Sequence, residues 1–165
     1  MDTDTFWRLV EQSQKGAENV DEQMEKLHTL VSELDPKEIL EFDRCFNERV
    51  RDAFRADLWA VAYIINGGCS DDCFDYFLGW LIVQGRMYYE AALTTPERAG
   101  DRVAPGEIVE CGSIWSVAAR AYEDRTGKTD FYEIAPVVYR TLMGELFDEE
   151  NVDALYPELA ERFRG

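Results

Sequence analysis

The sequence predicts an all-α fold, a single multi-helix bundle over residues 1–165, and three observations lead to this prediction. Apolar residues recur at steps of three and four along most of the chain, which is the spacing of one helix face. The stretches between them carry helix-capping residues, glycine or proline. Hydrophobic residues make up 46% of the 165 residues, so a chain of this length can bury a core of its own.

Two amphipathic helices open the predicted fold. Thr3 or Asp4 caps the first helix, which ends before Gly16. The second is defined by the apolar residues on one of its faces: Val20, Met24, Leu27, Leu30, Val31 and Leu34. It stops at Asp35-Pro36. The same pair starts the third helix, because Asp35 serves as the N-cap and proline is tolerated at the first helical position.

A central antiparallel helical hairpin, about 36–66 and 70–84, forms the middle of the predicted bundle. Its first helix becomes apolar on every side from Leu58 to Ile65, which is typical of a helix in the interior. The glycines of Asn66-Gly67-Gly68 end that helix, and Ser70 caps the next one. Because the connection is short, we expect the two helices to run antiparallel.

The rest of the chain is less regular. A short helix follows Gly85 and closes at Thr95-Pro96, and another helix is expected from about Ile114 to its end at Thr126-Gly127. Residues 97–108 fit a loop or at most one helical turn, while the pattern over 128–140 fits strand and helix equally well. A closing C-terminal helix is predicted from the spacing of Leu155, Leu159 and Phe163.

Charge is the most unusual property of the composition. Thirty-four acidic residues against 17 basic ones give a net charge of −17, which repels phosphate backbones and argues against direct nucleic-acid binding. The excess has three explanations: solubility alone, attraction of a basic partner, or imitation of nucleic acid. No stretch approaches the roughly 18 apolar residues of a membrane span. The acidic start Met1–Thr5 has no features of a secretory signal, so we expect a cytoplasmic protein that does not bind membranes.

The four cysteines, Cys45, Cys69, Cys73 and Cys111, are expected to be reduced thiols in that compartment. No C-x-x-C pair is present, and His28 is the only histidine, so buried core thiols are favoured over a zinc site. We expect no cofactor.

The candidate site consists of the turn over 66–72 and the polar residues that we expect around one end of the apolar hairpin. Asp57 and Arg86 fall toward the same end of an antiparallel hairpin, where they would form an ion pair or the rim of a pocket. Asp71, Asp72 and Asp75 are weak candidates for a divalent cation, although helix capping explains the first two as well. The ligand-binding candidates are Asp57, Asn66, Ser70, Asp71, Asp72, Gln84 and Arg86.

No phosphate-binding glycine loop, dinucleotide fingerprint, nucleophile elbow or H-E-x-x-H motif is present. The sequence therefore favours a non-enzymatic binding module, whose acidic surface engages a basic protein partner or a small ligand near the 66–72 turn. The first alternative is a metal-assisted enzyme that uses the carboxylates of Asp71, Asp72 and Asp75. The second is an acidic mimic of nucleic acid. The oligomeric state is left open.

Several segments resemble one known family. They are Phe6–Leu9, Asp57–Ile65, Gly67–Asp72, Phe77, Trp80–Arg86, Ala121-Tyr122, Thr126-Gly127 and Leu155–Pro157. In these segments the chain resembles the bacterial proteins grouped as domain of unknown function 4240, and the likeness is densest from Asp57 to Arg86. The resemblance implies a bacterial cytoplasmic protein and assigns no catalytic residue.

Overall fold

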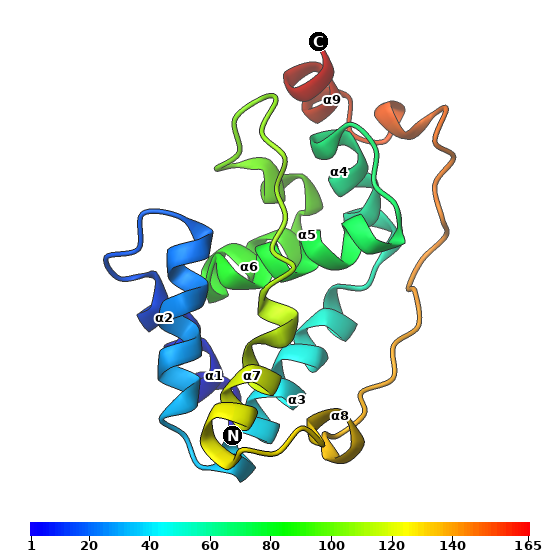
Figure 1. The fold of residues 1–165 in the computed structure, drawn as a ribbon. Coiled ribbons are helices and arrows are strands. Elements are labelled where there is room, and N and C mark those ends of the chain that lie inside the picture. The colour runs from blue at the N-terminus through cyan, green and yellow to red at the C-terminus, as the bar shows by residue number, and fades with distance from the viewer. The chain divides into compact units, whose positions relative to one another are not determined.

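The computed structural model describes all 165 residues and contains nine α-helices, two short 3-10 helices and no strand (Figure 1). The all-α prediction is therefore confirmed. The chain forms two compact units, one made of residues 1–51 and 112–139 and the other of residues 52–111 and 140–165. No helix is both long enough and apolar enough to cross a membrane.

The first unit is built on five helices: α1 (Thr3–Gln14), α2 (Val20–Ser32), α3 (Pro36–Ala53), α7 (Ile114–Thr126) and α8 (Phe131–Ile134). Helix α2 packs against both α1 and α7. The core of the first unit contains several aromatic side chains. Phe6 lies 5.2 Å from Phe42, and Phe46 meets Trp115 edge to face at 5.0 Å, measured between ring centroids.

Helix capping in this unit follows the local sequence. The backbone N–H of Glu38 donates to Oδ1 of Asp35 at 2.9 Å, as expected for an N-cap that precedes Pro36. The first helix is capped one residue earlier than predicted, by Asp2, which accepts a hydrogen bond of 2.7 Å from the N–H of Thr5.

The second unit contains the remaining elements: α4 (Ala56–Asn66), α5 (Asp71–Val83), α6 (Arg86–Thr94), η1 (Pro96–Gly100), η2 (Val152–Ala154) and α9 (Pro157–Arg164). Helix α4 packs chiefly against η1 and α9. Most of its side chains are buried, as its apolar composition predicts. Residues 97–108 were expected to form a loop with at most one helical turn, and the short helix η1 is that turn. The predicted C-terminal helix corresponds to α9.

The prediction of one continuous helix over 36–66 is wrong, because the chain leaves helical geometry between α3 and α4. Arg55 is extended, with φ −131° and ψ 142°, and acts as the N-cap of α4. Met143 donates its N–H to the carbonyl of Phe54 at 3.1 Å and accepts from the N–H of Ala56 at 2.9 Å. This isolated parallel β-bridge uses backbone groups that a continuous helix would pair internally.

The predicted hairpin is therefore limited to α4, the turn and α5. In Figure 1, α5 lies across α4 and does not run back alongside it. The turn itself forms as expected. Gly67 ends α4 in a left-handed conformation, with φ +68°, and the hydroxyl of Ser70 accepts from the N–H of Cys73 at 3.3 Å.

Candidate binding cleft

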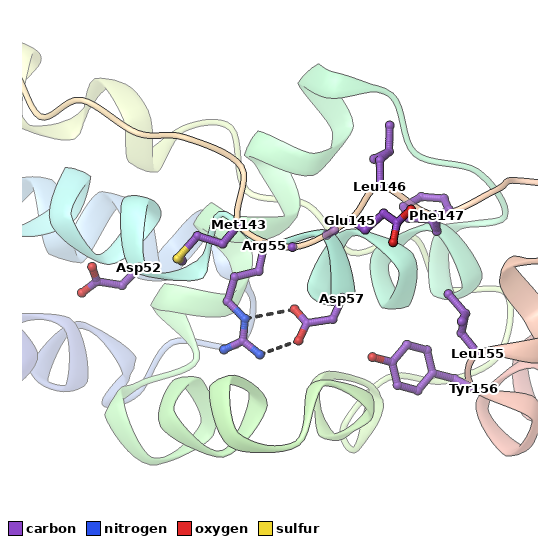
Figure 2. Close-up of a pocket in the computed structure, with 11 residues that line it drawn as sticks. Asp52, Arg55, Asp57, Met143, Glu145, Leu146, Phe147, Leu155 and Tyr156 are labelled. Atoms are coloured by element: carbon purple, nitrogen blue, oxygen red, sulfur yellow. Dashed lines mark hydrogen bonds and ion pairs between the residues drawn. The ribbon is translucent and has the colours of Figure 1, made fainter.

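A cleft of about 760 Å³ lies in the second unit, at the N-terminal end of α4. Three parts of the chain line it: the junction between α3 and α4, the segment from Met143 to Phe147, and the pair Leu155-Tyr156. Figure 2 shows the labelled side chains spread over these three segments, with Arg55 and Asp57 paired between Met143 and Tyr156. The volume lies within the range of roughly 300–1,000 Å³ that is common for ligand sites.

The break between α3 and α4 positions the first wall of the cleft, which is formed by residues within 52–57. The β-bridge to Met143 positions the second wall, which is formed by residues 143–147. Gly144 follows the bridge with φ +85°, a conformation that side-chain-bearing residues rarely adopt. The chain therefore turns directly after Met143. The next residues, Glu145 to Phe147, line the cleft as a non-helical segment.

Arg55 and Asp57 form an ion pair in the cleft. Arg55 donates from Nε to Oδ1 of Asp57 at 3.0 Å and from Nη2 to Oδ2 at 2.5 Å, so the pair is bidentate (Figure 2). Its third nitrogen, Nη1, donates to the carbonyl of Leu93 at 2.7 Å. Because each nitrogen of the guanidinium has a partner, Arg55 is fixed in the wall, and two of its five N–H groups are left for a ligand.

The cleft is negatively charged. Three acidic residues, Asp52, Asp57 and Glu145, line it with the single cation Arg55, and Glu145 is exposed with no ion-pair partner. An adjoining hollow of about 290 Å³ shares the side chain of Tyr156 and adds two further carboxylates, those of Glu97 and Glu158.

The negative charge of the cleft affects the pKa of Tyr156. Burial raises the pKa of its hydroxyl, and the charges of Asp57 and Glu97 raise it further, while Arg55 acts in the opposite direction. The hydroxyl is therefore protonated at neutral pH and can donate a hydrogen bond. In Figure 2 it is directed toward the side of the cleft that holds Asp57.

The lip of the cleft is apolar. Met143, Leu146 and Leu155 line it with exposed fractions of 46%, 58% and 56%, so much of their apolar surface is in contact with water. Phe147 is better anchored, because its ring meets Trp59 and Tyr63 edge to face at 6.4 Å and 5.5 Å between centroids. The cleft therefore combines negative charge with apolar contact area.

Asp57 is the one residue of the predicted site that lies in this cleft. The turn over 66–72 follows the opposite end of α4, about 14 Å away along the helix axis at 1.5 Å per residue. The sequence-predicted candidates are thus not brought together into one site.

The predicted residues of the turn have structural partners. Asn66 donates from Nδ2 to the carbonyl of Val109 at 3.2 Å and accepts from the N–H of Val109 at 3.0 Å, so it fixes the loop before Cys111. Ser70 is the N-cap of α5. Asp71 and Asp72 are exposed in the first turn of that helix, where the helix dipole favours negative charge.

The remaining polar candidates are also engaged. The predicted ion pair between Asp57 and Arg86 is wrong, because Asp57 pairs with Arg55 and Arg86 donates to Glu90, one turn along α6, at 2.8 Å. Gln84 donates from its side-chain nitrogen to the carbonyl of Trp80 at 3.3 Å.

The carboxylates predicted as weak metal ligands do not form a cation site. Oδ1 of Asp75 forms an ion pair with Nη1 of Arg140 at 2.7 Å. Asp71 and Asp72 are exposed at the start of α5. The structure contains no group of three or more histidine, cysteine, aspartate or glutamate side chains placed to hold a metal ion.

The expectation of four reduced thiols is wrong for two of the cysteines. Cys69 and Cys73 form a disulfide across the start of α5, with their Cα atoms 5.2 Å apart. Their separation of four residues brings them together over one helical turn. Cys45 and Cys111 are buried and form no disulfide, as predicted for core cysteines.

The first unit holds one strongly perturbed carboxyl. Burial raises the pKa of Asp43 from 3.8 to about 6, and a hydrogen bond of 3.1 Å from Nδ2 of Asn47 acts against this rise. Asp43 lies in α3, and its negative charge also contributes, after burial, to a raised pKa of Tyr132.

The fold and the cleft define this molecule as an all-α protein with an acidic, apolar-rimmed surface cleft. The model of the family described as "Protein of unknown function (DUF4240)" matches residues 1–124, so the chain belongs to that family. The resemblance identified from the sequence is thereby confirmed. No curated protein and no solved structure matches the chain.

Proposed function

We propose that this protein is a non-enzymatic binding module, and that its cleft takes a basic segment of a partner protein. The observation that carries the proposal is the composition of the cleft: three acidic residues and an apolar lip line it with a single cation, Arg55, which is already bound by Asp57 and Leu93. A ligand that brings both positive charge and apolar side chains would complement both features.

The charge of the whole chain supports a basic partner. A net charge of −17 attracts a cationic segment over distances longer than direct contact and accelerates association at low ionic strength. The same charge disfavours an acidic partner and a second copy of this chain. The proposal moves the binding function from the turn over 66–72 to the opposite end of α4.

A labelled probe peptide that alternates lysine and leucine tests the proposal. It is titrated with the full chain at low and at high salt, and binding is followed by fluorescence anisotropy. Reversing the charge in the cleft with Glu145→Lys should weaken binding about tenfold, close to 1.4 kcal/mol. The matched control is Glu110→Lys, which makes the same charge change at an exposed position beside Val109, near the turn.

The control separates local binding from general attraction. Equal losses for both variants would mean that the peptide responds to the overall charge, and the cleft would lose its assigned role. A loss confined to Glu110→Lys would return the site to the turn. Wild-type affinity in Glu145→Lys would reject the cleft as the binding site.

A further inference from the structure

We infer that the partner segment binds in the cleft as an added β-strand, pairing its backbone with the segment Glu145–Phe147. This inference rests on the proposed function and specifies the conformation of the partner. The backbone N–H and C=O groups of Glu145, Leu146 and Phe147 form no hydrogen bond within the chain. In β-strand addition an extended peptide pairs with exposed backbone groups that have no partner, and these three residues present such groups at the cleft.

The pairing of Met143 explains why this stretch is available. Met143 exchanges two backbone hydrogen bonds with the break between α3 and α4, so the segment begins in a strand-like position. Gly144 then turns the chain at φ +85°, and the pairing with residues 54 and 56 goes no further. The following three residues keep their donors and acceptors free where they line the cleft.

The side chains around this backbone fit an extended peptide with alternating character. Successive side chains of a strand point to opposite sides. An apolar residue of the partner would then contact Leu146 and Leu155, and its neighbours would direct lysine or arginine toward Asp57 and Glu145. A helical partner would satisfy its own backbone and leave these groups of the cleft in water.

The test uses backbone methylation of the lysine–leucine probe peptide. Two peptides carry N-methyl groups at the odd or at the even positions, so their charge and side chains remain the same. Only the N–H groups on one edge of a strand can pair with the cleft. One methylated peptide should therefore lose affinity at least tenfold, while the other should bind nearly as tightly as the unmethylated probe.

The protein is varied in the same experiment. Leu146→Pro removes one backbone N–H from the segment and should weaken binding of the unmethylated probe. Leu146→Ala is the matched control, since it removes the exposed side chain and keeps the N–H. A loss for Leu146→Pro well beyond that for Leu146→Ala supports strand addition, and equal losses contradict it.

The outcomes separate the two proposals. If both methylated peptides bind as tightly as the unmethylated probe, strand addition is wrong while the basic-segment function survives. If the unmethylated probe itself does not bind, the proposed function fails, and strand addition fails with it. Binding of spermidine as tight as that of the unmethylated probe would show that cation recognition alone operates in the cleft and would overturn strand addition.

Discussion

Replacing Asp43 by asparagine should stabilise the protein at neutral pH, because the folded chain holds this carboxylate at an energetic cost. Burial raises the pKa of Asp43 from 3.8 to about 6. A difference of about two pKa units corresponds to about 3 kcal/mol, since each unit is about 1.4 kcal/mol. Asparagine removes the charge and keeps an oxygen that can accept from Asn47. The free energy of unfolding near neutral pH should therefore rise by up to about 3 kcal/mol.

The sign of the pH dependence follows from the raised pKa. Between about pH 6 and pH 4 the folded chain binds a proton at Asp43 that the unfolded chain does not bind. The contribution of Asp43 to stability is therefore largest below this window and is lost as the pH rises through about 6. The advantage of Asp43→Asn over wild type should fall to about half near pH 5 and disappear below about pH 4.

Urea denaturation of both proteins, followed by circular dichroism at several pH values, measures this advantage directly. The comparison at each pH cancels the titration of the other carboxylates. Glu123→Gln is the control, because it removes the same charge from an exposed position of α7 in the same unit. A gain below about 0.5 kcal/mol near neutral pH, or an equal gain in Glu123→Gln, would refute the assigned burial cost of Asp43.

Three further substitutions test the second unit by urea denaturation. Asn66→Ala removes two hydrogen bonds to Val109 and should cost about 2–3 kcal/mol, whereas an unchanged stability would argue against its structural role. Gly100→Ala places a methyl group 3.1 Å from Leu159 and should cost about 1–3 kcal/mol by overpacking. A neutral result would mean that α9 can shift freely. Cys69→Ser opens a short disulfide loop and should cost about 2 kcal/mol, with reductant lowering only wild-type stability.

Helix ends were predictable because their causes are local. Ser70 bonds to a residue three positions on, and Gly67 ends α4 through its own backbone conformation. Neighbouring residues supply everything that such a cap requires. The fold class was predictable for the same reason, because the spacing of apolar residues within each segment indicates a helix. The burial of α4 was predictable because Leu58–Ile65 is apolar on every side.

The break at Arg55 was not predictable from its neighbours. The apolar rhythm continues through Val50, Phe54 and Leu58 without a glycine or proline, so local preference favours one helix. The competing partner of the backbone is Met143, far along the chain. The partner of Asp57 was missed for the same reason, since a broken helix places Arg55 beside it.

Most of the cleft was likewise invisible in the sequence. Its second wall comes from residues 143–147, which belong to no recognisable motif, and Leu155 and Tyr156 complete the lining. The only signal was compositional, namely a group of acidic and apolar residues without helical spacing. Such a group gains meaning only when the fold places it against Asp57.

Trp59 gives the second unit an internal optical probe. Its indole N–H donates to the carbonyl of Cys69 at 2.9 Å, and its ring stacks on Phe74 and meets Phe147. One chromophore thus touches the disulfide turn beyond one end of α4 and the cleft wall at the other. Its emission should respond both to thiol reduction and to occupancy of the cleft. In a chain whose other three tryptophans are replaced by phenylalanine, this one signal would show whether the two ends of α4 are energetically coupled.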